Sequence, residues 1–329
     1  MSTSSRANNP TKRVGVRRAL TTAAVAPLIL LAACGGGGGN TLEGGSGKDS
    51  GGGEVVIAHQ AYTEMEVMAE MYSALLEDAG FTPRLQAVDT RDLYVPPLSS
   101  GKVDVVPDYA SSMTEFLNRD TNGAEAKPVA SPDVEETIGQ LDKLGTEYGV
   151  EPLEPAEAED ANAFAVTKEF SEENDLTTLS DLGDLGEPIT LAAASDCPER
   201  PDCQVGLEST YGIEFSGFEP LGFGTVQTKD ALQSGEVDLG QVGTSDGSLE
   251  SLKLVVLEDD KDLQNAENLT PVVNSQFLEQ NPDVADSLNK LSDVLTTEDL
   301  KSLNAQVDVK RELAEDVANQ YLQDKGLLG

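Results

Sequence analysis

Two stretches, LSSGKVDV (98–105) and LQSGEVDL (232–239), decide how this chain folds, because they place one structural unit in each half. Both fit the pattern L-x-S-G-x-V-D-[VL]. In each copy we expect a helix to end at Ser-Gly, where glycine supplies the left-handed conformation after a helix, and a strand to follow at once. The repeat therefore predicts two α/β halves of similar design.

Apolar runs and amphipathic segments alternate around both copies, as is typical of strands and helices in turn. The expected elements, in chain order, are a strand at 54–58, a helix at 63–80, a strand near 84–88, a helix from about 91, strands at 103–106 and 188–192, a helix containing Leu207, and helices from about 275 onward. This strand–helix–strand rhythm predicts parallel strands with helices on both faces.

A polar segment follows each copy of the repeat, at 107–112 and at 241–247. Ligands bind outside the carboxyl ends of the strands in α/β sheets. We therefore expect the two segments to face a common ligand cleft.

The first 33 residues have the pattern of a secretory signal peptide. Residues 1–18 contain five basic and no acidic side chains, and 19–33 form an apolar stretch too short to span a bilayer as a stable helix. The following Leu31-Ala32-Ala33-Cys34 is similar to the lipobox of bacterial lipoproteins, in which the cysteine is lipidated. We expect an extracytoplasmic protein anchored to the cell membrane by lipid on Cys34. A plain membrane anchor is the alternative, and Arg17-Arg18 leaves Sec and twin-arginine export both open.

Residues 34–53 are expected to form a lipidated tether. Eleven of the residues 35–53 are glycine, so the stretch cannot bury enough surface to offset its ordering entropy. As a random coil it would reach roughly 25 Å. The folded part then begins near Glu54, and its length suits two domains or one large one.

The chain is strongly acidic, with 22 basic and 59 acidic residues and a net charge of −37. Five of the basic residues lie in the signal region, so the mature chain has 17 against 59 and a net charge of −42. Phosphate would be repelled, which excludes nucleic acid as a partner. A heavily solvated surface is the simplest reason for the acidity.

Three cysteines occur, and assigning Cys34 to lipid leaves Cys197 and Cys203 as a pair in an oxidising compartment. A disulfide is the favoured interpretation. A metal site or a redox pair are alternatives, although no histidine lies nearby and the spacing is not CxxC.

Seven motifs together give the chain a family likeness. They are YTE (62–64), SGKVDVVPDY (100–109), CPERPDC (197–203), TSDG (244–247), LEDDK (257–261), PVV (271–273) and LSDVLTTEDL (291–300). In this order the chain resembles the substrate-binding proteins of ABC uptake systems for osmoprotectants, of the glycine betaine, choline and proline betaine type.

The resemblance implies an α/β fold of two lobes, the periplasmic-binding-protein fold of type II, with a mixed sheet flanked by helices in each lobe. Lobe 1 would combine 54–155 with 265–329, and lobe 2 would be 156–264. Two crossover strands, near 154–164 and 254–271, would join them. Ligand binding would close the lobes by a hinge motion, and the closed form would dock on a permease.

A trimethylammonium group donates no hydrogen bond, so proteins hold it against the faces of aromatic rings. The chain has no tryptophan, which leaves tyrosine to form such a cage. The residues that we expect to bind the ligand are Tyr62, Tyr94, Asp108, Tyr109 and Ser111 from lobe 1, and Gln241, Thr244 and Asp246 from lobe 2. Ordinary packing or hinge roles are the alternative for each tyrosine.

The chain departs from the family pattern at two positions in the second half. Gly243 stands where many members carry an aromatic residue, and Glu267 lies where a tyrosine is common. Lobe 2 therefore lacks the rings that are expected at these two positions. Glu267 could pair with a cation directly, or the solute could be other than a betaine.

The sequence predicts a monomeric receptor that delivers a small osmoprotectant, a quaternary ammonium compound, to ABC permease subunits. An enzyme is disfavoured, since the chain has one histidine and no GxSxG, HExxH or Walker motif. No cofactor or metal is expected. A receptor for another small polar solute, a ligand-sensing module and an enzyme on the same fold are the alternatives.

Overall fold

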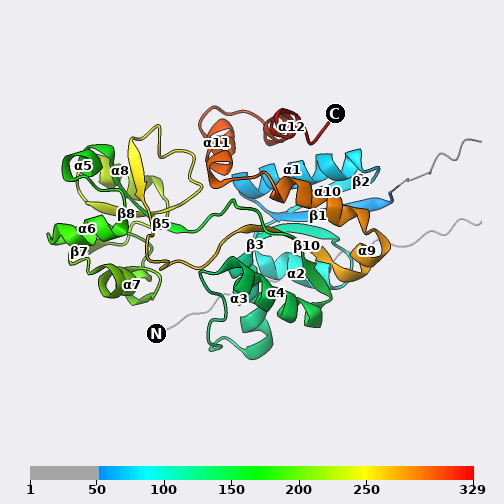
Figure 1. Cartoon of the computed structure of the whole chain (residues 1–329), viewed down its shortest axis with the longest axis horizontal. Coiled ribbons are helices and arrows are strands. Elements are labelled where there is room, and N and C mark those ends of the chain that lie inside the picture. Colours follow the sequence, from blue (N-terminus) through cyan, green and yellow to red (C-terminus); the bar gives the residue numbers. More distant parts are fainter. Residues whose placement is uncertain (1–51) are drawn as a thin grey trace, which may run out of the picture. The chain divides into compact units, whose positions relative to one another are not determined.

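The computed structural model describes residues 52–329 (Figure 1). The expected signal peptide, Cys34 and the tether up to residue 51 lie outside the described residues. The strands are β1 (Glu54–Gln60), β2 (Thr82–Val88), β3 (Val105–Tyr109), β4 (Val150–Pro152), β5 (Asn162–Thr167), β6 (Ile189–Ala192), β7 (Phe215–Glu219), β8 (Leu239–Gly243), β9 (Leu254–Leu257) and β10 (Leu269–Asn274). The helices are α1 (Thr63–Asp78), α2 (Arg91–Ser99), α3 (Ala110–Asn122), α4 (Val134–Tyr148), α5 (Lys168–Asn174), α6 (Leu179–Leu185), α7 (Gln204–Gly206), α8 (Val226–Ser234), α9 (Ser275–Gln280), α10 (Asp283–Ser292), α11 (Thr297–Asp308) and α12 (Ala314–Asp324). A 3₁₀ turn (Cys197–Glu199) precedes α7, and a π-helical turn (Leu207–Tyr211) follows it.

The strands form two five-stranded sheets, in the orders β2-β1-β3-β10-β4 and β7-β6-β8-β5-β9. Three strands of each sheet run parallel, and the fourth, β10 or β5, runs antiparallel to both of its neighbours. We call the first sheet with the helices packed on it lobe 1, and the second lobe 2. The two lobes share one topology, as the repeat predicts.

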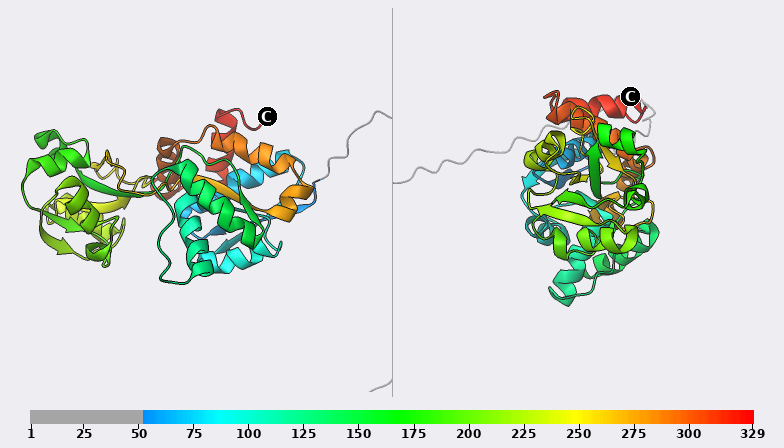
Figure 2. Two further views of the ribbon diagram at one scale, coloured as in Figure 1. Left: turned by 60° about the horizontal axis from the view of Figure 1, so that its bottom comes forward. Right: turned by 90° about the vertical axis from the view of Figure 1, so that its left-hand side faces the viewer.

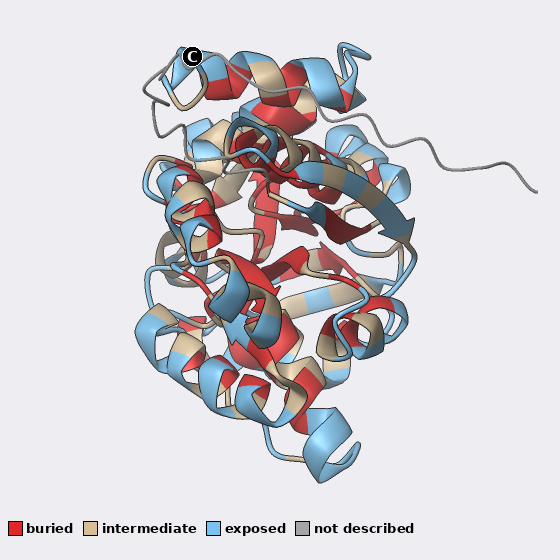
Figure 3. Ribbon diagram, turned by 90° about the vertical axis from the view of Figure 1, so that its right-hand side faces the viewer, coloured by how far each residue is buried: buried red, intermediate tan, exposed pale blue. Residues whose placement is uncertain are grey.

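The inner strands β1, β3, β8 and β10 are buried on both faces, which explains their largely apolar sequences, whereas the residues of the edge strands β2 and β7 are only partly buried or exposed (Figure 3). In β1, Val55 and Ile57 pack toward α1, whereas Val56 and Ala58 pack toward α2, α3 and α4. Successive side chains of a strand point to opposite faces, so an uninterrupted apolar run fills two cores.

The C-terminal helices complete lobe 1. Helices α10, α11 and α12 all contact α1, and together they form the core that covers one face of the first sheet (Figure 2). The second half of the chain thus ends on the lobe in which the first half began.

The two copies of the repeat have the same structural role: each ends a helix at glycine and continues strand pairing through its aspartate. Its glycines, Gly101 and Gly235, have φ of 68° and 72°, the left-handed conformation that follows each helix. The side chain of the aspartate in each copy accepts a hydrogen bond from the backbone of the adjacent strand, in line with the backbone pairing of the sheet. Asp104 accepts a hydrogen bond from the backbone N–H of Val56 at 2.8 Å, and Asp238 accepts one from that of Thr190 at 2.8 Å.

The sequence placed the strand after the first repeat too early. β3 begins at Val105 rather than at 103, because Asp104 occupies the pairing position with its side chain. The expected loop at 107–112 is also wrong, since β3 continues to Tyr109 and α3 begins at Ala110.

Two segments, 153–161 and 258–268, run between the sheets (Figure 2). They pair with one another through an antiparallel bridge between Glu159 and Asn268. Thr244 holds the first segment to lobe 2, because its hydroxyl accepts from the N–H of Ala161 and donates to the carbonyl of Glu159, both at 3.0 Å. These paired segments are the connection across which the lobes meet.

The loop after β8 also packs directly on α11. A methyl group at Gly247 would lie 2.4 Å from the backbone nitrogen of Ala305 and 2.5 Å from the carbonyl of Lys301. Only glycine lets the loop approach the helix backbone this closely.

We expect Gly247→Ala to lower the free energy of unfolding by about 1–3 kcal/mol, because the added methyl group must push the loop from α11. Gly139→Ala is the matched control, since Gly139 is exposed in α4 with no atom near the added carbon. It should raise the free energy of unfolding by about 0.5–1 kcal/mol. Chemical denaturation of both variants measures the difference, and equal effects would contradict the close contact.

Candidate functional site

A cavity of about 350 Å³ lies where the carboxyl ends of both sets of parallel strands meet the connecting segments. This volume is at the lower end of the range for small-molecule sites. The cavity is lined by Gln60, Tyr62, Arg91, Tyr109, Ser112, Asp160, Asn162, Arg200, Asp202, Phe223, Gln264, Asn265 and Glu267. Three aromatic rings and five charged side chains therefore share a small space.

Two of the expected ligand residues, Tyr62 and Tyr109, lie in the cavity lining. Tyr62 immediately precedes α1 and is 40% exposed, whereas Tyr109 ends β3 and is 5% exposed. The remaining expected residues lie outside the lining: Tyr94, Asp108 and Ser111 from lobe 1, and Gln241, Thr244 and Asp246 from lobe 2.

Asp108 positions Arg91 at the cavity. Its carboxylate accepts from Arg91 Nη2 at 2.7 Å and from Nε at 3.0 Å, and it also accepts from the hydroxyl of Tyr94. Asp108 and Tyr94 are almost completely buried, at 1% exposed each. Asp108 is thus fully engaged with protein groups, and the arginine is the member of this cluster that faces the cavity.

Glu267 enters the cavity from the second connecting segment. The backbone N–H and the hydroxyl of Ser112, in the first turn of α3, donate to its two carboxylate oxygens at 3.0 and 2.9 Å. A helix N-terminus favours such a negative charge. Burial has the opposite and larger effect, and it raises the pKa of Glu267 to about 7.

Asp160 enters from the first connecting segment. A side chain at Gly243 would place its first carbon 2.5 Å from Asp160 Oδ1 and 3.4 Å from the ring of Phe223. The missing side chain at 243 therefore makes room for both the carboxylate and the ring. Lobe 2 nevertheless contributes a ring from a position that the family pattern did not indicate, because Phe223, in the loop after β7, lines the cavity.

Lobe 2 holds its polar groups in a chain of hydrogen bonds. Gln241, buried in β8, donates to Asn162 at 3.1 Å, and Asn162 donates to Asp202 at 2.9 Å. Asp202 in turn accepts from Arg200 Nε at 3.1 Å. Gln241 thus acts behind the cavity, by fixing the residues that line it.

A disulfide joins Cys197 and Cys203, which are both completely buried. It closes the short loop that carries Arg200 and Asp202. The crosslink restricts the positions that this ion pair can adopt beside the cavity.

The ring of Tyr109 connects the cavity to the contact between the lobes. Its hydroxyl donates to the carboxylate of Glu64 in α1, which also accepts from Asn304 Nδ2 in α11 at 2.6 Å. The same amide donates to the carbonyl of Ser245 in lobe 2 at 3.0 Å. Burial and the nearby charge of Asp160 raise the pKa of Glu64 to about 7.

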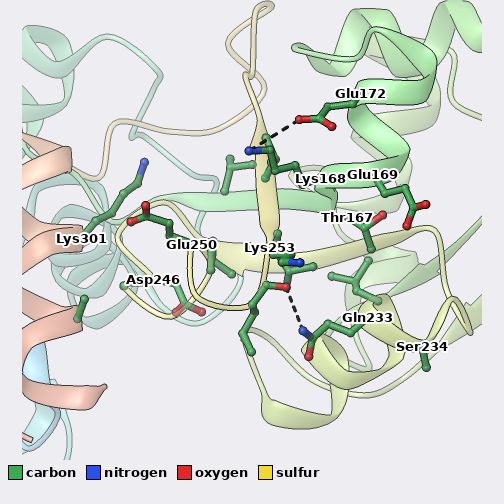
Figure 4. Close-up of a pocket in the computed structure, with 18 of the residues that line it drawn as sticks. Thr167, Lys168, Glu169, Glu172, Gln233, Ser234, Asp246, Glu250, Lys253 and Lys301 are labelled. Atoms are coloured by element: carbon green, nitrogen blue, oxygen red, sulfur yellow. Dashed lines mark hydrogen bonds and ion pairs between the residues drawn. The ribbon is translucent and has the colours of Figure 1, made fainter. Parts of the chain in front are cut away.

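A larger groove, of about 1750 Å³, lies between lobe 2 and α11 (Figure 4). Its lining contains many charged side chains and no aromatic ring. Asp246 faces this groove and is already bound by Lys229 Nζ at 2.8 Å. The smaller cavity is therefore the one suited to an organic solute.

Sequence reasoning missed most of the cavity residues. Glu267 had a signal as a departure from the family pattern, Ser112 lies in the polar segment 107–112, and Arg200 and Asp202 lie in the CPERPDC motif. Arg91, Asp160 and Phe223 lie outside the motifs, and only the fold brings them to the cavity.

Two negative findings concern the part of the chain from 52 to 329. No group of three or more His, Cys, Asp or Glu side chains there is placed to hold a metal ion. None of the helices described is both long and apolar enough to cross a bilayer.

Comparison with known proteins places the cavity in context. Residues 53–324 match the family described as the substrate binding domain of the ABC-type glycine betaine transport system. The chain is 27% identical over 283 residues to the glycine betaine-binding protein YehZ of Escherichia coli, covering 83% of this chain and 90% of the relative. It is equally identical to a glycine-betaine-binding protein of Pseudomonas aeruginosa, covering 83% and 88%.

The solved structure of apo YehZ superposes with a TM-score of 0.72, at 27% identity, and the match covers 84% of this chain and 99% of that one. The predicted type II fold of two mixed sheets is confirmed. The predicted likeness to solute-binding proteins rather than enzymes is confirmed as well.

The two Arg–Asp pairs of the cavity differ in burial, which gives a matched test. Asp108 is 1% exposed at its side chain, whereas Asp202 is 35% exposed. Asp108→Asn should lower the free energy of unfolding by about 3 kcal/mol, because it leaves a buried arginine without its counter-charge. Asp202→Asn should cost less than about 1 kcal/mol. Equal losses in urea denaturation would show that Asp108 does not hold Arg91 in place.

Proposed function

Because the chain belongs to the family of substrate-binding domains of ABC-type glycine betaine transport systems, we propose that it captures a quaternary ammonium solute in the cavity and delivers it to an ABC permease. Members of this family are the extracytoplasmic solute-binding components of such transporters. The observation that supports the choice of solute is that three rings line one small cavity together with two carboxylates that no basic side chain of residues 52–329 pairs with.

The rings suit a methylated ammonium group. Such a group is attracted to the negative face of an aromatic ring, with about 0.5–2 kcal/mol for each contact. Tyr62 and Tyr109 come from lobe 1 and Phe223 comes from lobe 2. A solute held by rings of both lobes binds better when the lobes approach, so solute binding favours closure.

We propose that closure occurs by bending at segments 153–161 and 258–268. They run between the sheets and pair with one another only over a short stretch, so a small rotation there changes the distance between the rings. The lobes would comprise 54–155 with 265–329, and 156–264. A closed, loaded monomer would then be the form that the permease recognises.

We also propose that lipid on Cys34 holds the receptor on the outer face of the cell membrane. The lipobox-like sequence and the glycine-rich segment after it support this. Anchoring raises the local concentration of loaded receptor at its permease.

Tyr62→Leu should weaken binding of the solute about tenfold, because it removes one ring but keeps an apolar side chain. Tyr62→Phe should bind as the wild type does. Tyr148→Leu removes a tyrosine of α4 outside the cavity lining and serves as the control. Isothermal titration calorimetry with choline, glycine betaine, carnitine and ectoine measures the dissociation constants of each variant. Failure of the wild type to bind any of them would refute a quaternary ammonium solute.

Cys34→Ser should abolish lipidation and move the protein from the detergent phase to the aqueous phase in Triton X-114 partitioning. Mass spectrometry of the wild type should find the mature N-terminus at Cys34 with lipid on its sulfur. A mature N-terminus elsewhere, without lipid, would contradict the anchor.

A further inference from the structure

Two carboxylates face the cavity from the two connecting segments. The backbone N–H of Asp160 donates to the carbonyl of Glu267 at 3.1 Å, and the adjacent residues Glu159 and Asn268 form the antiparallel bridge. In this register Asp160 and Glu267 are direct cross-strand neighbours, with their side chains on the same face. Both line the cavity.

The other charges of the cavity are already balanced. Arg91 is neutralised by Asp108, and Arg200 by Asp202, through ion pairs in which each arginine uses two nitrogens. Within residues 52–329, neither Asp160 nor Glu267 has a basic side chain in ion-pair contact. The cavity therefore has two carboxyl groups in excess of its basic side chains, and both are negatively charged at pH values above the raised pKa of Glu267, which is about 7.

The surroundings of the pair add more negative charge. The titratable and charged groups that face it are Arg91 and Asp108 for Glu267, and Glu64, Tyr109, Glu159 and Asp246 for Asp160, with the Arg200–Asp202 pair across the cavity. Asp246 is itself bound by Lys229. Like charges on neighbouring strands destabilise the pairing, and a bound cation removes that cost.

We propose that the Asp160–Glu267 pair selects solutes by net charge, so that the site takes a quaternary ammonium cation without a carboxylate in preference to a zwitterion. This inference rests on the proposed function and narrows its substrate class. It also couples the choice of solute to the closure of the lobes, since Asp160 and Glu267 lie on the two segments at which we propose that the lobes bend.

The arginines do not offset this preference. A carboxylate on the solute would need an arginine with spare positive charge, but Arg91 and Arg200 each already hold an aspartate. The carboxylate would thus enter a cavity that is already negative. A hydroxyl in its place brings no charge and can accept or donate a hydrogen bond with the polar groups of the lining.

Choline and glycine betaine test the proposal, because both carry a trimethylammonium group and only betaine carries a carboxylate. In calorimetry at pH 8 and low salt, the wild type should bind choline at least tenfold more tightly than betaine. Asp160→Asn and Glu267→Gln should each weaken choline at least tenfold and change betaine less than threefold. Glu236→Gln is the control, since it removes one negative charge at an exposed position of lobe 2 outside the cavity lining, and it should change neither.

The pH dependence gives an independent readout. Burial raises the pKa of Glu267 to about 7, so a proton competes with the cation below that value. Choline affinity should therefore fall between pH 8 and pH 6 in the wild type, and this fall should be smaller in Glu267→Gln. Thermal unfolding without ligand should show both amide variants at least as stable as the wild type at pH 8. Each variant removes one of two neighbouring negative charges.

Betaine binding as tightly as choline in the wild type would overturn the inference and leave the proposed function intact. An affinity for choline that is the same in Asp160→Asn, Glu267→Gln and the wild type would overturn it as well. Binding of neither ligand would instead contradict the proposed function. The wild-type comparison needs no variant, so a misfolded variant does not prevent a decision.

Discussion

The pairing of two connecting segments is the constraint on which the site depends. Each sheet directs the carboxyl ends of its three parallel strands to one edge, and only the connection between the sheets determines that these edges share a cavity. The bridge between Glu159 and Asn268 fixes the register of that connection. It also places Asp160 directly opposite Glu267. The same hydrogen bonds therefore join the lobes and put two carboxyl groups in the lining of the cavity.

Burial separates the charges of the cavity into two groups. Asp108 is satisfied by Arg91 and by Tyr94, so it is a fixed part of the structure. Glu267 receives hydrogen bonds but has no basic side chain of residues 52–329 in ion-pair contact, and burial raises its pKa. A group of the second kind costs stability in the empty receptor at pH values above its ordinary pKa. Under the proposed selection by charge, a cationic solute would supply the missing positive charge, and the free-energy cost of the unpaired carboxylates in the empty receptor would favour binding of a cation.

Much of the fold could be predicted because local rules specify it. The repeat fixed the helix ends at Gly101 and Gly235 through backbone conformation, and continuous apolar runs indicated strands buried on both faces. The start of β3 was misplaced because Asp104 pairs through its side chain, which a hydropathy pattern does not reveal. In the site, Tyr62 and Tyr109 were found because they follow the ends of predicted strands.

By itself, the sequence determined the two α/β lobes and their common design, since these follow from local pattern. It indicated Gly243 and Glu267 only as departures from a family pattern. The tertiary structure alone decided that the space at Gly243 is filled by Asp160 and Phe223, and that Asp160 and Glu267 are cross-strand neighbours in the lining of one cavity. The physical reason is that these neighbours lie far apart along the chain, and their proximity is set by the register between the segments that connect the two sheets.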